Sequence, residues 1–348
     1  MLTRRGVLYQ FGAAGAAALA LRSGVSFGAI GPQTPVAFEV PRGACDCHVH
    51  VFDPVRFPYA ERRVYTPPTA SFEDLMDLHK ALHLDRVVIV QPSVYGTDNA
   101  CTLDASRRLG GRGRAVVVIG KDTTQMQLDD MAGMGARGIR LNLETTTTGP
   151  FDAAAAKGML DTAVGQLRGR DWHIQIYTRL SVLAELKDQL AQLQLPVVVD
   201  HFGRASAVEG PDQEGLDALI ALLKSGRAYV KISAAYRMEK ANGLYPDATP
   251  IAQALIAANP DRIVWGSDWP HPNSAAGRGK PLSELAEPFP IDNGMVLNQL
   301  PKWANDRNLR TKILVDNPAR LYGYGVPIPE AEIPTGTVRV PEPAGAGR

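Results

Sequence analysis

Short apolar runs alternate with longer segments of helical period from Gly43 onward. The runs predict eight strands, over residues 44–51, 86–91, 115–119, 138–143, 173–177, 197–200, 228–232 and 262–266. Several runs, such as Arg86-Val-Val-Ile-Val90, are almost continuously apolar, which is typical of parallel strands buried on both faces. The helical spacing predicts helices over residues 71–83, 99–109, 153–169, 180–194, 213–224 and 249–258, the first with Ser71 as N-cap.

Eight strands with intervening helices favour a single (β/α)8 TIM barrel, which we place over residues 31–325. A doubly wound open sheet is the alternative, but no Gly-x-Gly-x-x-Gly follows any of these strands. Residues 52–70 form an aperiodic, proline-rich loop after the first strand, on the face where barrels place active sites. Residues 326–348 are predicted to be a Pro/Gly-rich, extended tail.

The first thirty residues have the features of an export signal. Arg4-Arg5 precedes an apolar run over 11–21, and small residues follow around Ala29, which indicates a cleaved twin-arginine-type signal over residues 1–30. The run is too short to cross a bilayer. An amphipathic N-terminal helix is the alternative, but no polar face interrupts the run. We therefore expect a periplasmic protein.

The composition of the chain limits the classes of partner that it is expected to bind. In 348 residues, 37 Lys and Arg balance 36 Asp and Glu, so no global field favours nucleic acid or an anionic membrane. A hydrophobic content of 45% excludes disorder as the main state. The three cysteines are Cys45, Cys47 and Cys101, and their spacing predicts no structural disulfide. The expected partner is a small-molecule substrate.

The strongest chemical signal is the sequence Ala44–His50 at the first strand. Alternate residues of a strand share a face, so Asp46, His48 and His50 are predicted to face the barrel interior while the cysteines between them face the helices. Two imidazoles at the C-terminal end of a barrel strand indicate an active site.

Two more strand ends carry candidate catalytic groups. Asp268 closes the eighth strand and His271 follows it, so Asp268 is a candidate metal ligand or general base. His201 closes the sixth strand, and Asp200 is predicted to face the opposite way and to orient a neighbour at most. His79, His83 and His173 lie on a helix or at a strand start and are interpreted as structural.

Arginines recur at the same ends of the predicted strands. Arg140 lies on the fourth strand, and Arg204 and Arg237 follow the sixth and seventh. Guanidinium groups converging on one barrel mouth indicate an acidic substrate. Tyr177 ends the fifth strand and is a candidate hydrogen-bond donor, with a core tyrosine as the alternative.

Taken in order, these motifs resemble the amidohydrolase superfamily, and within it the lactone hydrolases of 2-pyrone-4,6-dicarboxylate and 4-sulfomuconolactone. The segments that carry the resemblance are Gly43–Phe52, Val198–Arg204, Trp265–Asn273 and Val315–Tyr322. The resemblance implies hydrolysis of a small acidic lactone in the catabolism of aromatic compounds. This chain departs from the pattern of the 2-pyrone-4,6-dicarboxylate hydrolases at residues 143–148, where that pattern has a second basic residue.

The resemblance also implies roles for single residues. Asp268 would activate water, while His48, His50 and His201 would polarise the lactone carbonyl and stabilise its oxyanion. The acidic groups of the substrate would be held by Arg140, Tyr177, Arg204, Arg237 and His271.

Metal dependence is left open by these motifs. Tyr177 stands where many amidohydrolases have a zinc-binding histidine, so a binuclear site is not expected. A mononuclear zinc ion on His48, His50, His201 and Asp268 is the alternative to the expectation of no essential metal, which is based on the neighbouring arginines.

Two other functions are compatible with this scaffold. In the first, Asp268 moves a carbon-bound proton, as in a lactone isomerase, or the enzyme is a decarboxylase. In the second, the protein is a periplasmic binding protein without catalytic activity.

Overall fold

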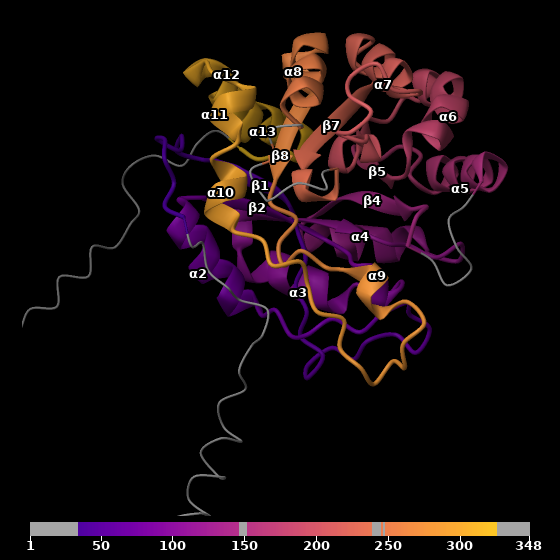
Figure 1. Cartoon of the computed structure of the whole chain (residues 1–348). Coiled ribbons are helices and arrows are strands. Elements are labelled where there is room, and N and C mark those ends of the chain that lie inside the picture. Colours follow the sequence, from indigo (N-terminus) through magenta and orange to yellow (C-terminus); the bar gives the residue numbers. More distant parts are fainter. Residues whose placement is uncertain (1–33, 146–151, 239–244, 246–247, 326–348) are drawn as a thin grey trace, which may run out of the picture.

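The computed structural model describes residues 34–145, 152–238, 245 and 248–325, and its core is a nearly closed, eight-stranded parallel barrel (Figure 1). The strands are adjacent in chain order, and each lies within about three residues of its predicted range. They are β1 (Cys45–Val49), β2 (Arg86–Val90), β3 (Gly113–Val117), β4 (Ala136–Asn142), β5 (His173–Tyr177), β6 (Val197–Val199), β7 (Ala228–Ser233) and β8 (Ile263–Gly266).

The barrel closes where β8 meets β1. A parallel bridge joins Val49 to Trp269, and the amide of His50 donates to the carbonyl of Trp269 at 2.8 Å. Gly266 permits this approach, because a Cβ atom at that position would lie 2.8 Å from Cβ of His48. The closure therefore brings the segment that carries Asp268 directly beside the two histidines of β1.

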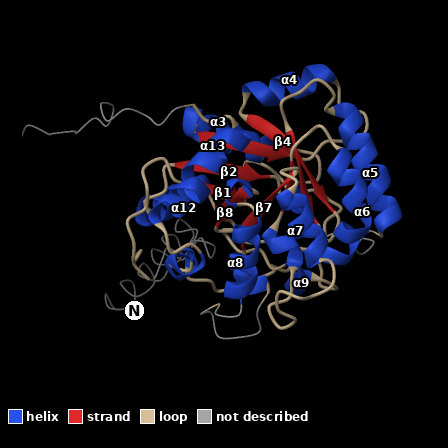
Figure 2. Ribbon diagram, turned by 90° about the horizontal axis from the view of Figure 1, so that it is seen from above, coloured by secondary structure: helices blue, strands red, loops and turns tan. Residues whose placement is uncertain are grey.

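Helices surround the strands (Figure 2). The six predicted helices are present as α2 (Phe72–Leu82), α3 (Ala100–Arg108), α5 (Ala153–Gln166), α6 (Leu180–Gln192), α7 (Leu216–Lys224) and α8 (Ala248–Ala258). Ser71 caps α2 and forms a reciprocal capping box with Asp74. The helices that the sequence pattern did not predict are α4 (Gln125–Gly133), α9 (Ser274–Gly277), α10 (Asn293–Leu297), α11 (Leu300–Trp303), α12 (Arg307–Thr311) and α13 (Asn317–Tyr322).

Two apolar clusters hold the barrel together. One fills the space between the strands and the helices, and the other lies inside the barrel and includes Cys45, Cys47, Val88, Val198 and Val264. The cysteines are buried and free, as predicted.

The predicted orientation of β1 is wrong at its start. Cys45 and Cys47 face the barrel interior, whereas Asp46 faces outward and lies 3.5 Å from Nε2 of His79 on α2. The reason is a register irregularity between Asp46 and Val49, which breaks the simple alternation before His48.

The predicted export signal and the predicted tail lie outside the described residues. Within the described part of the chain, no helix has the length and apolar character needed to cross a membrane.

Candidate active site

Four side chains converge where the strands end. Nε2 of His48, His50 and His201 lies 3.7, 3.8 and 3.7 Å, respectively, from Oδ1 of Asp268. All four residues are at most 3% exposed. The structure thus brings together every residue that the sequence nominated for catalysis.

Left-handed backbone conformations position two of these groups. His201 has φ 52° in a short 3-10 turn (His201–Arg204) directly after β6, and Asp268 has φ 65° after β8. Such conformations are strained for non-glycine residues and cluster at functional sites. Because of the turn at His201, both Asp200 and His201 face the interior, so the predicted opposite orientation of Asp200 is wrong.

The two oxygens of Asp268 have different surroundings. Oδ2 accepts hydrogen bonds from Tyr236 Oη at 2.6 Å and from Arg237 Nε at 3.0 Å. Oδ1 has no hydrogen-bond partner among the described residues and faces the three imidazoles. Burial alone would raise the pKa of Asp268, but Arg237 and the imidazoles lower it below its usual range, so the group is a carboxylate.

The histidines are neutral and at least one offers a lone pair to the site. Burial lowers the pKa of His50 to about 3 and that of His201 to about 4. Nδ1 of His50 lies 2.7 Å from the carbonyl of Val90, which can only accept a hydrogen bond. Neutral His50 must therefore carry its proton on Nδ1 and present an unprotonated Nε2, which cannot donate a hydrogen bond to a substrate oxygen.

These donors fit a divalent metal ion. Separations of 3.7–3.8 Å are too long for hydrogen bonds and are of the size expected between ligands of one cation. Ligand atoms of His48, His50 and Asp268 all lie within 4.8 Å of one another. The contacts of His50 with a carbonyl and of His201 Nδ1 with Ser233 Oγ at 2.8 Å match the outer contacts of metal-binding histidines. The geometry thus favours a mononuclear site more strongly than the sequence did.

A pocket opens above this cluster, and three of the predicted substrate-binding residues line it. They are Arg140, Tyr177 and Arg237. The pocket has a volume of about 40 Å³, room for a few waters. Its other lining residues include Tyr65 from the predicted active-site loop and Ser93, Asn142 and Thr145.

The other two predicted substrate-binding residues do not line this pocket but lie beside it, Arg204 over the ring of Tyr177 and His271 against that of Tyr236. The side chain of Arg204 is 41% exposed and pairs with Glu144, which also pairs with Arg179 at 3.2 Å. His271 is buried, and its Nε2 lies 2.9 Å from Oδ1 of Asn293. Their roles toward substrate stay predictions.

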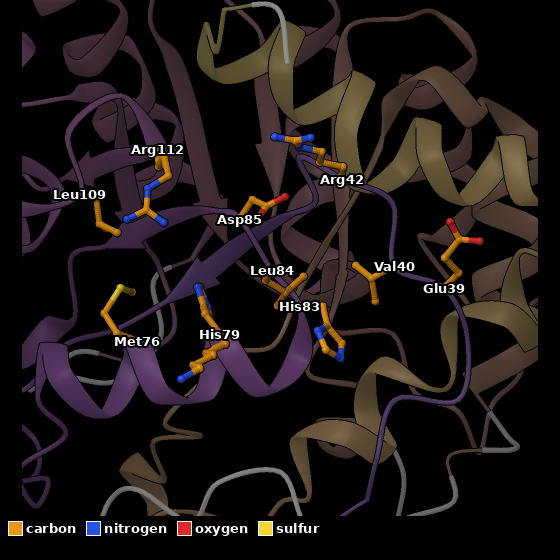
Figure 3. Close-up of a pocket in the computed structure, with 11 residues that line it drawn as sticks. Glu39, Val40, Arg42, Met76, His79, His83, Leu84, Asp85, Leu109 and Arg112 are labelled. Atoms are coloured by element: carbon orange, nitrogen blue, oxygen red, sulfur yellow. The ribbon is translucent and has the colours of Figure 1, made fainter. Parts of the chain in front are cut away.

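A second pocket lies at the N-terminal ends of β1 and β2, away from Asp268. In Figure 3, side chains of α2, among them His79, face the segments that precede these two strands. His83 caps α2 in a left-handed conformation. This agrees with structural roles for both histidines.

Sequence reasoning missed several polar residues of the barrel interior. Lys231 on β7 and Gln175 on β5 are fully buried below the histidines, and Tyr236 binds Asp268. Lys231 could have been found from the sequence, because a lysine is unusual within an apolar strand segment.

Known proteins resemble this chain in sequence and in structure. A family model described as amidohydrolase matches residues 45–324. The chain is 36% identical over 306 residues to a 4-sulfomuconolactone hydrolase of Hydrogenophaga intermedia, covering 84% of this chain and 94% of the relative. It is 34% identical over 301 residues to a 2-pyrone-4,6-dicarboxylate hydrolase of Comamonas testosteroni, covering 84% and 93%. A solved structure from Pseudomonas putida, provisionally named 2-pyrone-4,6-dicarboxylic acid hydrolase, has a TM-score of 0.67 and 28% identity, covering 83% and 100%.

Proposed function

Because the chain belongs to the amidohydrolase family, we propose that it is a hydrolase that opens a small lactone bearing a carboxylate or sulfonate group, using water activated by Asp268. The observation that carries the proposal is the arrangement of Asp268. Its Oδ1 is unpaired among the described residues and faces three imidazoles, at the base of a pocket lined by two arginines.

The chemistry follows from that arrangement. Oδ1 of Asp268 accepts a proton as the water oxygen attacks the lactone carbonyl carbon, while Tyr236 and Arg237 fix the carboxylate through Oδ2. The ring C–O bond then breaks, and Asp268 returns the proton to the leaving alkoxide. When bound by His48, His50, His201 and Asp268, a divalent cation such as zinc would polarise the carbonyl and acidify the water.

The proposal is tested with a panel of lactones. Purified protein is assayed on 4-sulfomuconolactone, 2-pyrone-4,6-dicarboxylate and the neutral γ-butyrolactone, with and without a chelator. The proposal predicts a higher kcat/KM for at least one acidic lactone than for γ-butyrolactone. It is wrong if the protein turns over none of the acidic lactones.

Arg140 is predicted to bind the acidic group of the substrate. It is 6% exposed, lines the pocket and lies 5.4 Å from the Tyr177 ring centroid. Arg140→Met should raise KM for acidic lactones about 10- to 100-fold, because a hydrogen bond to a charged group contributes roughly 1.5–3 kcal/mol. Steady-state kinetics on acidic and neutral lactones measure this.

Arg307→Met is the matched control for that variant. Arg307 is exposed on α12, pairs with Glu39 at 2.6 Å and does not line the pocket, so its loss should leave KM unchanged. An equal rise in KM for neutral and acidic lactones in Arg140→Met would exclude an anion-binding role for Arg140.

We further propose that residues 1–30 direct export to the periplasm, on the strength of Arg4-Arg5 and the apolar run that follows. Replacing both arginines by lysine should leave the protein in the cytoplasm. Cell fractionation measures this, and unchanged periplasmic recovery of the double variant would contradict a twin-arginine route.

A further inference from the structure

A buried ion pair lies beneath the histidines. Lys231 and Asp200 are both completely buried, and Nζ of Lys231 lies 3.5 Å from Oδ1 of Asp200. Gln175 joins the two, because its Oε1 accepts from Lys231 at 2.6 Å and its Nε2 donates to Asp200 Oδ2 at 2.9 Å. These three groups form a polar layer inside an otherwise apolar part of the barrel.

This polar layer contacts one candidate metal ligand. Nδ1 of His48 lies 3.3 Å from Oδ1 of Asp200, an oxygen that has no hydrogen-bond partner among the described residues. Nζ of Lys231 also lies 3.3 Å from Nδ1. The other ring nitrogen of His48, Nε2, likewise lacks a hydrogen-bond partner in the described structure and faces Asp268.

The two neighbours of Nδ1 favour opposite tautomers of His48. If Asp200 accepts a proton from Nδ1, Nε2 carries a lone pair toward the site. If instead Lys231 donates to Nδ1, Nε2 carries the proton and cannot bind a metal ion. Oδ1 of Asp200 favours the first arrangement, because its ion-pair contact with Lys231 at 3.5 Å is long and a hydrogen bond from Nδ1 would satisfy this buried carboxylate oxygen.

We propose that Asp200 is a positioning residue that accepts the Nδ1 proton of His48 and so directs an Nε2 lone pair into the site, while Lys231 balances the buried charge of Asp200. The inference rests on the metal-binding role of His48 in the proposed function. It assigns to the Asp200–Lys231 pair a function in ligand orientation rather than in substrate contact.

Zinc affinity tests the inference without any substrate. Asp200→Asn keeps the shape of the side chain but replaces the carboxylate, and zinc binding is measured by competition with a chromophoric chelator. The inference predicts affinity about 10- to 100-fold weaker than in the wild-type protein, the usual effect of losing an outer partner of a metal-binding histidine. Asp188→Asn, at an exposed position on α6, should leave the affinity unchanged.

The tautomer of His48 gives a second readout that needs no variant at Asp200. In protein labelled with ¹⁵N-histidine, the nitrogen shifts of His48, assigned by their loss in His48→Gln, should report a proton on Nδ1. A proton on Nε2 in the wild-type protein, or wild-type zinc affinity in a folded Asp200→Asn variant, would overturn the inference. Neither measurement depends on turnover, so failure of lactone hydrolysis is distinguishable from failure of this inference.

Discussion

Replacing Asp268 with asparagine is expected to lower kcat for the preferred lactone by about 100- to 10,000-fold, the range typical for loss of a general base. Oδ1 of Asp268 is the described carboxylate oxygen that faces all three imidazoles, and an amide in its place neither accepts the proton from water nor supplies a charged ligand. Steady-state kinetics and zinc content are measured together.

The fold should survive this change. Tyr236 can still donate to the amide oxygen at the position of Oδ2, and an unchanged melting temperature, within a few degrees, would confirm an intact barrel. Asp212→Asn, at an exposed position, is the control and should retain full activity. Activity of Asp268→Asn within tenfold of the wild-type value would remove Asp268 as the base.

Lys231→Met is expected to have the largest effect on stability. The substitution leaves the carboxylate of Asp200 buried without its ammonium partner, and removal of one member of a buried ion pair typically costs about 3–5 kcal/mol. Burial alone would raise the pKa of Asp200, but Lys231 and His48 hold it below its usual range, so Asp200 is ionised. Without Lys231, its remaining cationic partner among the described residues is Arg140, whose Nε lies 3.6 Å from Oδ2. Urea unfolding measures the free energy of unfolding.

The double variant Asp200→Asn with Lys231→Met is the matched control. It removes both charges, so it should recover part of the stability lost in Lys231→Met. If Lys231→Met unfolds at the same urea concentration as the wild-type protein, the pair does not stabilise the barrel.

The barrel itself could be predicted from the sequence because parallel barrel strands are buried on both faces. The continuous apolar runs at β2 and β6 therefore marked strands regardless of which face each residue occupies. The helix α4 was missed because its pattern is weak: it buries only Leu128, and Met126 is exposed.

The catalytic cluster was predictable for a related reason. His48, His50, His201 and Asp268 each follow or end an apolar strand, and the C-terminal ends of barrel strands meet at one mouth. The orientation of Asp46 was not predictable, because an alternation argument assumes that no residue interrupts the ladder, and β1 has an irregularity there.

Contacts between residues far apart in the sequence explain the remaining differences between the predicted and the observed site. Arg204 was expected in the pocket but pairs with Glu144, a residue sixty positions earlier on another strand end. Lys231 and Asp200 meet only because β6 and β7 are neighbours in the barrel. Such contacts between distant residues leave no local pattern in the sequence.

The protein is expected to add water to an acidic lactone. The most direct test is turnover of the preferred acidic lactone in H₂¹⁸O, followed by mass spectrometry of the product. Hydrolysis predicts a ring-opened acid, in its hydroxy, enol or keto form, with one ¹⁸O atom in the new carboxylate. An unlabelled product of the same mass as the substrate would contradict this expectation and identify an isomerase.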